Sequence, residues 1–313
     1  MGRVSNVLKH HAAVGWLQIV SKKVAMVDSN VAIRLKGQPP MKLGYHSITW
    51  GQGVVGDPSG VTSIKDLYYR SPGSMEQAIT DIAAAGYAGT EMFDGNLADF
   101  AATPEVLTES LYNSGLELIS VYTGANFIYA DVLPDELYRI NRAAELAVMF
   151  GARRLVVGGG ARRAAGTTNE DYTLLGAGLD RVVDIAEQHG LAASYHPHLG
   201  TIAESPDEIE RVFTSSRIAF CPDTAHLAAG GGDPAALIRA HSDRIAHVHL
   251  KDLTTAPFAF QPLGEGDLDF DGILSAVREV GYDGWLVVEL DTYDGDPKIA
   301  AEISKKFLET RLG

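Results

Sequence analysis

The chain has 313 residues, 46% of them hydrophobic and 21% charged, as expected of a soluble globular protein with a sizeable core. Its formal net charge of −14 argues against nucleic acids and membranes as partners, because phosphate surfaces attract clustered Lys and Arg. No apolar run approaches the roughly 18 to 20 residues that span a bilayer. The single cysteine, Cys221, suits a reducing cytoplasm and is expected to be a buried, unreactive thiol.

Residues 1–40 differ from the rest of the chain because they hold six Lys or Arg and only one acidic residue. Polar residues between Gln18 and Lys23 interrupt the apolar run that a signal peptide would need. We expect residues 1–40 to form an N-terminal extension and residues 41–313 to form one domain. The alternative is that natural translation starts at Met41.

From Met41 onward, apolar runs of strand length alternate with amphipathic stretches of helical length such as residues 74–86 and 135–151. The eight strand-length runs are residues 41–49, 87–93, 116–122, 153–159, 191–198, 218–223, 245–252 and 285–291. No dinucleotide-binding glycine pattern follows the first run, and eight repeats fit closure better than an open doubly wound sheet. The sequence therefore predicts a single (β/α)₈ TIM barrel, an α/β fold.

Glycines stand where several of the predicted helices should end, just before the next strand. A glycine at this position can adopt the left-handed conformation that terminates a helix. The positions with this spacing are Gly86, Gly151, Gly190 and Gly281.

Polar and aromatic residues gather at the C-terminal ends of the predicted strands, where TIM barrels carry their active sites. In chain order they are His46, Trp50, Glu91, Tyr122, His196, His198, Asp223, His226, His249, Lys251 and Glu289. His247, His249 and Lys251 alternate along one strand and so share one face of it. We expect these side chains to converge at one mouth of the barrel.

Imidazoles and carboxylates at one mouth form a mixed nitrogen and oxygen site that suits a divalent metal ion. Without a thiolate, a closed structural zinc site is not expected. A bound ion with open positions can polarise a carbonyl group. Each histidine taken singly is more often a hydrogen-bonded core residue, so the prediction depends on their convergence.

Five motifs carry a resemblance to a known family: "YHPHLGT" (195–201), "CPDTAHLAAGGGDP" (221–234), "HVHLKD" (247–252), "PLGEGDLDF" (262–270) and "GYDGWLVVELD" (281–291). They resemble the sugar phosphate isomerase/epimerase superfamily with the xylose-isomerase-like TIM barrel, and within it inosose dehydratase-like proteins. The resemblance implies one divalent metal ion, Mn²⁺ or Co²⁺ first, with Zn²⁺, Fe²⁺ and Mg²⁺ as alternatives.

The resemblance also implies the metal ligands, which in this superfamily are a Glu, an Asp, a His and a second Glu. The last three correspond to Asp223, His249 and Glu289. His196 stands where the first Glu is usual, so we expect it to be the fourth ligand, with His198 as the alternative. The absence of a carboxylate at position 196 favours a dehydratase over the isomerases of the superfamily, several of which use that Glu as an acid or base.

The activity implied is that of a metal-dependent carbon–oxygen lyase that dehydrates a keto-inositol or keto-sugar, in inositol or other carbohydrate catabolism. The candidate acids and bases are Glu91, His198, His226 and Lys251. Alternatives are a ketose epimerase or isomerase, a lyase of 3-keto-glycosides, an apurinic endonuclease and a non-catalytic subunit. The expected partner is a small keto-polyol or keto-sugar, with a homo-oligomer or a hetero-subunit complex also open.

Overall fold

The computed structural model of the protein describes residues 32–33, 41–51 and 69–312. In this part of the chain, eight parallel strands alternate with helices, and each strand overlaps one of the eight predicted runs. The strands are β2 (Met41–His46), β3 (Gly89–Phe93), β4 (Glu117–Gly124), β5 (Arg154–Gly158), β6 (Ala192–His196), β7 (Ala219–Phe220), β8 (Val248–Leu250) and β11 (Trp285–Val288). The predicted TIM barrel is confirmed.

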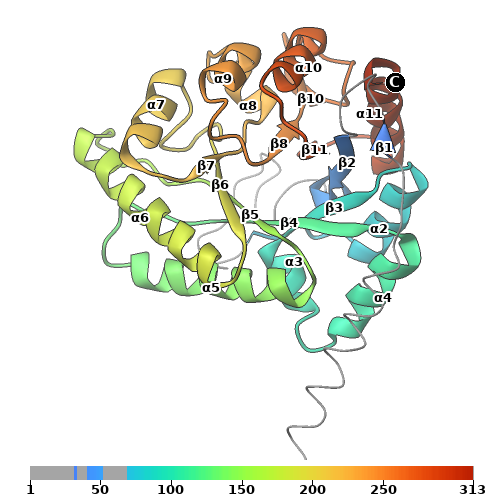
Figure 1. The fold of residues 1–313 in the computed structure, drawn as a ribbon, viewed down its shortest axis with the longest axis horizontal. Helices are drawn as coiled ribbons and strands as arrows, with labels where there is room; N and C mark the ends of the chain where they lie inside the picture. Colours follow the sequence, from blue (N-terminus) through green and yellow to red (C-terminus); the bar gives the residue numbers. More distant parts are fainter. Residues whose placement is uncertain (1–31, 34–40, 52–68, 313) are drawn as a thin grey trace, which may run out of the picture. The chain divides into compact units, whose positions relative to one another are not determined.

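The strands form one sheet in the order β7-β6-β5-β4-β3-β2-β11-β8, which curls so that its two ends meet (Figure 1). Parallel bridges between Phe220 and Ile245 and between Asp223 and His249 join β7 to β8. The chain therefore closes the barrel at two of the residues predicted to bind metal. A short antiparallel strand, β1 (Ala32–Ile33), pairs with β2, so two residues of the predicted extension join the sheet; the other predicted extension residues lie outside the described part.

Most of the helices surround the strands on the outside (Figure 1). They are α2 (Met75–Ala84), α3 (Asp94–Asp99), α4 (Pro104–Ser114), α5 (Leu133–Met149), α6 (Asn169–Gln188), α7 (Pro206–Ser215), α8 (Thr224–Ala229), α9 (Pro234–Ala240), α10 (Phe270–Glu279) and α11 (Pro297–Leu312). A 3₁₀ turn, η1 (Ser47–Gly51), follows β2. The predicted helix-ending glycines all have positive φ, namely Gly86, Gly151, Gly190 and Gly281.

The interior of the barrel changes from apolar to polar along its axis. Ile119, Trp285 and Val287 pack together near the starts of β4 and β11. Gly44 leaves the space that the Ile119 side chain occupies, because a Cβ at this position would collide with it. Closer to the C-terminal ends of the strands, buried histidines and acids replace the apolar side chains. The apolar side chains thus fill the N-terminal end of the barrel, and the polar side chains lie at the C-terminal end, where TIM barrels carry their active sites.

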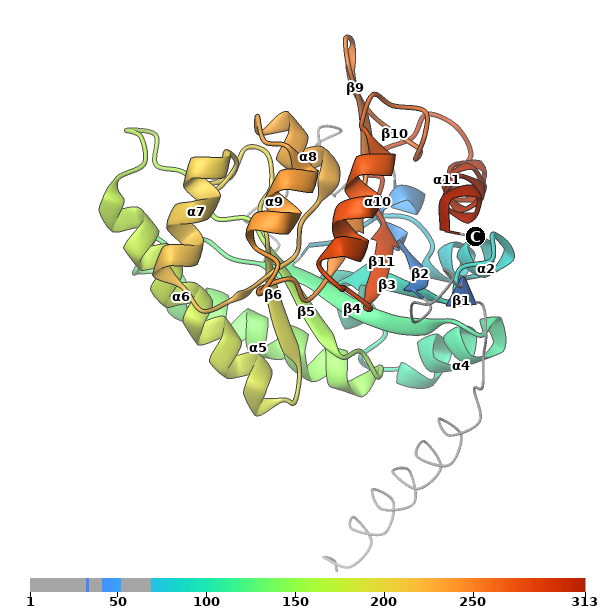
Figure 2. The ribbon, with the colours of Figure 1, turned by 45° about the horizontal axis from the view of Figure 1, so that its top comes forward.

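A two-stranded hairpin leaves the barrel after β8. Strands β9 (Asp252–Thr255) and β10 (Phe258–Gln261) pair antiparallel, and Figure 2 shows the hairpin standing out beyond the barrel. Asp252 lies at its base, where its carboxylate accepts backbone hydrogen bonds from Gly264 and Gly266 at 2.9 and 3.1 Å. Asp252 therefore braces the loop that follows the hairpin.

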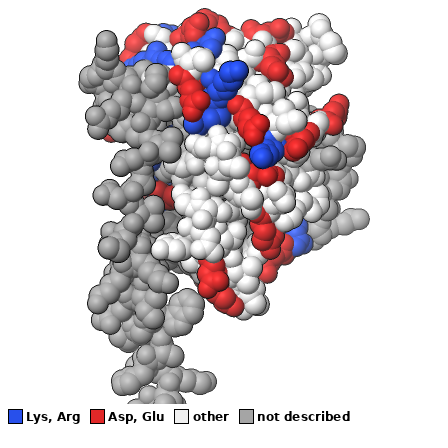
Figure 3. Space-filling view, turned by 90° about the vertical axis from the view of Figure 1, so that its right-hand side faces the viewer, with Lys and Arg blue, Asp and Glu red and all other residues white. Residues whose placement is uncertain are grey.

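The face on which α2, α4 and α11 lie carries charges of both signs (Figure 3). Lys and Arg stand beside Asp and Glu here, as in the pairs of Lys298 with Glu302 and Lys305 with Glu309 along α11. Among the described residues of this face, no broad basic patch is visible. In the part of the chain that the structure describes, no helix combines the length and the apolar character needed to cross a membrane.

Candidate metal centre

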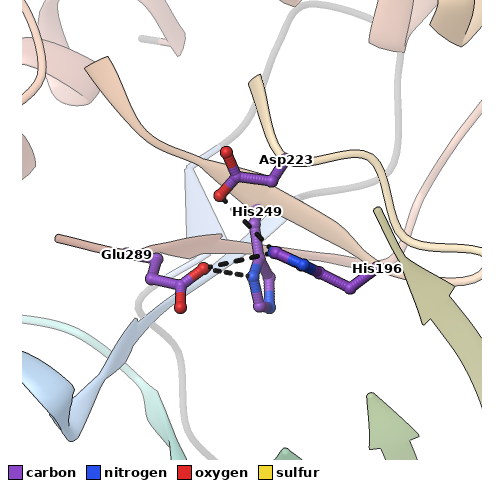
Figure 4. Close-up of side chains that lie close together, drawn as sticks. All are labelled: His196, Asp223, His249 and Glu289. Atoms are coloured by element: carbon purple, nitrogen blue, oxygen red, sulfur yellow. Dashed lines mark hydrogen bonds and ion pairs between the residues drawn. The ribbon is translucent and has the colours of Figure 1, made fainter. Parts of the chain in front are cut away.

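Four side chains from neighbouring strands meet at the C-terminal mouth of the barrel (Figure 4). His196 ends β6, Asp223 follows β7, His249 lies in β8 and Glu289 follows β11. Each offers one ligand atom, and these atoms lie within 4.8 Å of one another. All four side chains are buried. The structure thus brings together the four residues that the sequence predicted as ligands, including His196 rather than His198.

The spacing of the four residues is that of ligands around one small cation. His249 Nδ1 lies 2.6 Å from Glu289 Oε2, and His196 Nε2 lies 3.5 Å from the same oxygen. His196 Nε2 is also 3.7 Å from Asp223 Oδ2. Atoms that each bind an ion at about 2.1 Å lie roughly 3 to 3.5 Å apart. Small side-chain shifts would therefore convert this arrangement into a coordination shell.

Several polar atoms that face this centre lack a hydrogen-bond partner among the described residues. They include Nε2 of His196 and Oδ2 of Asp223. A buried polar atom without a partner costs about 1 to 3 kcal/mol. A divalent cation would satisfy these atoms, and the mixed imidazole and carboxylate set suits a transition ion. The residues present therefore fit a metal ion.

The charge state of the two acidic ligands also suits a cation. Burial raises the pKa of Glu289, but Lys251 and His249 outweigh burial and hold that pKa well below its ordinary value. Burial likewise raises the pKa of Asp223, and Lys251 and His196 outweigh it. Both side chains are thus carboxylates at neutral pH, ready to bind a positive ion.

A second group of polar side chains borders the first. His198, His226 and Asp291 also place ligand-type atoms within 4.8 Å of one another. The rings of His198 and His226 lie 3.8 Å apart, and the ring of His196 lies 5.5 Å from that of His226. The two histidines predicted as acids or bases therefore stand beside the predicted ligands, at the same mouth of the barrel.

Lys251 joins the two groups. Its buried Nζ lies 2.7 Å from Asp291 Oδ1 and 3.0 Å from His226 Nε2. It also lies 3.5 Å from Asp223 Oδ2 and 3.4 Å from Glu289 Oε2. Burial lowers the pKa of Lys251, but the three carboxylates outweigh burial and raise that pKa. Lys251 is therefore an ammonium ion held at the centre of the site.

His198 and His226 differ from Lys251 because both are neutral. Burial lowers the pKa of His226 well below its ordinary value, and the neighbouring His198 and Lys251 lower it further. Burial also lowers the pKa of His198. The Nδ1 of His198 donates to the Leu199 carbonyl oxygen at 2.8 Å, which leaves its Nε2 unprotonated. His198 can therefore accept a proton.

Glu91, the fourth predicted acid or base, lies elsewhere. It is fully buried, and its carboxylate contacts His247 Nε2 at 3.0 Å and His249 Nε2 at 3.1 Å. Burial lowers the pKa of His247 to about 4, so this imidazole is neutral. Glu91 thus contacts the candidate ligand His249 and is not part of the group formed by His198, His226 and Asp291.

Sequence reasoning gave no role to two residues of the site, Asp291 and Phe260. Asp291 stands two positions after Glu289, a spacing that alternation along a strand could have assigned to the same face. Phe260 comes from the hairpin, with its ring 5.0 Å from Lys251 Nζ and 5.3 Å from the ring of His226. The hairpin was not predicted, so the sequence offered no signal for Phe260. Cys221 is buried, and burial raises its pKa to about 11, as expected of an unreactive thiol.

Comparison with known proteins gives a match to one family and to several curated relatives. The family described as "Xylose isomerase-like TIM barrel" matches residues 79–311. An inosose dehydratase of Geobacillus kaustophilus is 29% identical over 308 residues, covering 86% of this chain and 94% of its own. A rhizopine catabolism protein of Rhizobium meliloti is 30% identical over 281 residues, covering 80% of this chain and 82% of its own.

Solved structures have the same fold at lower sequence identity. The IOLI protein, whose crystal structure holds a zinc atom, superposes with a TM-score of 0.68 at 18% identity, covering 87% of this chain and 98% of its own. This similarity agrees with the barrel described above.

Proposed function

The chain belongs to the xylose isomerase-like TIM barrel family, and we propose that it is a metal-dependent dehydratase that removes water from a keto-inositol or a related keto-sugar. The curated relatives named inosose dehydratases support this reaction, because they match over most of both chains. The observation that carries the proposal is the pairing of a metal-ligand quartet with an adjacent ammonium ion and neutral imidazole. We place the enzyme in the cytoplasm.

We propose that His196, Asp223, His249 and Glu289 hold the ion, with Mn²⁺ or Co²⁺ as the ion used. The two carboxylates among these ligands suit Mn²⁺, and the two imidazoles suit Co²⁺. When bound, the ion supplies Lewis acidity, which polarises a ketone and acidifies the neighbouring C–H bond. The zinc atom in a protein of the same fold supports a divalent ion as the cofactor.

His198 is the base that the geometry favours. Its Nε2 is unprotonated because its Nδ1 donates to the Leu199 carbonyl oxygen. Its side chain is only partly buried, so a substrate can reach it. His198 thus removes the proton from the carbon next to the ketone. His226 has its Nε2 engaged by Lys251 and therefore orients the lysine.

Lys251 is the acid in this proposal. Its ammonium group is held by Asp291 at 2.7 Å and by His226 at 3.0 Å. The ring of Phe260 lies 5.0 Å from Nζ and helps to hold it in place. Lys251 gives a proton to the β-hydroxyl as its carbon–oxygen bond breaks. One C–H and one C–O bond break, a C=C bond forms, and water leaves. The proton that His198 has taken replaces the one lost by Lys251, through solvent.

The test compares a variant at the base with a matched histidine variant outside the site. His198→Gln should lower turnover of a keto-inositol by about 10²- to 10⁴-fold, the usual contribution of a general base, while metal content stays at the wild-type level. His189→Gln changes a histidine that bonds Asn141 at the end of α6 and should leave turnover unchanged. Chelation should abolish turnover, and added Mn²⁺ or Co²⁺ should restore it. Full turnover by His198→Gln or by the chelated enzyme would contradict the proposal.

A further inference from the structure

Glu91 is the meeting point of a buried polar network beneath the metal centre. His247 Nε2 lies 3.0 Å from Glu91 Oε2, and the Ser120 hydroxyl donates to the same oxygen. His249 Nε2 lies 3.1 Å from Glu91 Oε1, and His46 Nε2 lies 3.4 Å from it. All five side chains are fully buried. The mechanism proposed above uses none of these contacts.

The histidine His249 belongs to both the network and the metal centre. Its Nδ1 faces Glu289 at 2.6 Å, while its Nε2 faces Glu91. A neutral imidazole has one proton, so one nitrogen donates and the other has a free lone pair. A carboxylate accepts hydrogen bonds only. When Nδ1 uses its lone pair for the metal ion, the proton of the ring is on Nε2, where the Glu91 carboxylate can accept it.

We propose that Glu91 is a positioning residue that fixes the tautomer and the ring orientation of His249, so that Nδ1 is presented to the metal ion. This inference rests on the metal centre of the proposed function. A ligating histidine whose other nitrogen donates to a carboxylate is held in place and made more basic. The role differs from the acid–base role that the sequence suggested for Glu91.

The other members of the network keep Glu91 in its accepting state. The Nδ1 of His46 accepts a hydrogen bond from the Ile48 backbone N–H at 3.0 Å, so the proton of this imidazole is on Nε2, toward Glu91. Four donor groups therefore surround one carboxylate. Glu91 is fully buried among these side chains, which separates it from the partly buried base at His198.

The same residues have the spacing of a second metal site, since Glu91, His247 and His249 also place ligand-type atoms within 4.8 Å of one another. The two interpretations predict different stoichiometries. A positioning carboxylate predicts one ion per chain in the wild type and in Glu91→Gln. A second metal site predicts two ions in the wild type and one in the variant.

The experiment measures Mn²⁺ and Zn²⁺ binding by calorimetry on the full chain. Glu91→Gln should bind one ion about 10- to 100-fold more weakly than wild type. Glu136→Gln is the matched control because Glu136 is also buried and pairs with Arg139 at 3.0 Å, outside the network. It should change the dissociation constant by less than twofold. Unchanged affinity with reduced turnover in Glu91→Gln, or two ions in the wild type, would overturn the inference.

A second readout tests the tautomer with Zn²⁺ bound and without a variant at Glu91. Long-range ¹H–¹⁵N spectra of the Zn²⁺-loaded wild-type protein should show the His249 proton on Nε2, with the signal assigned by its loss in His249→Gln. A proton on Nδ1 would overturn the inference. If the wild type binds no ion, the proposed function fails. If the wild type binds one ion and Glu91→Gln binds it equally well, the inference alone fails.

Discussion

The two oxygens of Asp223 contact different partners, and two substitutions can separate them. Oδ1 accepts a hydrogen bond from the His226 backbone N–H at 2.8 Å and so caps the N-terminus of α8. Oδ2 faces His196 and Lys251 at 3.7 and 3.5 Å and has no hydrogen-bond partner among the described residues. Asp223→Asn keeps an oxygen for the cap but removes the charge. Asp223→Ala removes both.

The free energy of unfolding should distinguish the two variants in the absence of metal. Both lose the ion pair with Lys251, so this loss cancels in the comparison. Replacing an N-cap acceptor by alanine costs about 0.5 to 2 kcal/mol. Asp223→Ala should therefore be about 1 kcal/mol less stable than Asp223→Asn. The two variants should not differ in metal affinity, because both lose a charged ligand. Each should bind the ion more than ~100-fold more weakly than wild type, which exceeds the usual effect of losing a residue that contacts a ligand but not the ion.

Urea denaturation in the presence of a chelator measures the first difference, and atomic emission analysis of dialysed protein measures the second. Equal stability of the two variants would show that Oδ1 does not cap α8. Wild-type metal content in Asp223→Asn or Asp223→Ala would show that Asp223 is not a ligand.

Three further predictions concern the hairpin, the pH dependence and the N-terminus. Phe260→Leu should lower kcat/KM about 3- to 30-fold, in line with a partly buried cation–π contact, whereas Phe258→Leu on the exposed part of the hairpin should leave it within twofold; equal effects would exclude a specific role for Phe260. Burial lowers the pKa of His196, but its carboxylate neighbours outweigh burial and raise this pKa above its ordinary 6.5. Protonated His196 therefore stabilises the metal-free fold at pH values below 6.5, and this stabilisation is lost as the pH rises through the raised pKa. The Tm of the chelated protein should accordingly fall above pH 6.5, whereas the Tm of the metal-loaded protein should not. The same dependence of Tm on pH in both forms would refute this prediction. Removal of residues 1–31 should leave turnover and Tm unchanged, while removal of residues 1–40 also deletes β1 and should lower Tm slightly; an inactive first truncation would contradict the predicted domain boundary.

The fold and the convergence of polar residues at the strand ends could be predicted from strand periodicity, whereas the choice of four ligands came from the family resemblance. Alternation puts His247, His249 and Lys251 on one strand face, and the four helix-ending glycines mark where four of the strands begin. The strand ends of a closed barrel meet by geometry, so His196, Asp223, His249 and Glu289 had to converge once the barrel was inferred.

The depth of a residue within the barrel could not be predicted from alternation. Glu91 shares the inward-facing pattern of the site residues but lies below them, in contact with His247. A shift of strand register at Thr90 and Glu91 helps to set this depth, and one sequence does not reveal it. The hairpin of β9 and β10 was missed for another reason. Strand β9 starts only two residues after the end of β8, so the sequence pattern assigned both strands to one predicted run. Phe260 was therefore missed as well.

The most direct test of the proposed reaction is the mass of the product formed from a keto-inositol in D₂O. Dehydration and epimerisation both exchange the proton next to the ketone, so exchange alone does not distinguish them. Dehydration removes one water and creates a conjugated ketone or diketone that absorbs in the near ultraviolet. The metal-loaded enzyme should give this lighter, absorbing product, with His198 and Lys251 both required. A product of unchanged mass, formed from a ketose at a comparable rate, would contradict the dehydratase and indicate an epimerase.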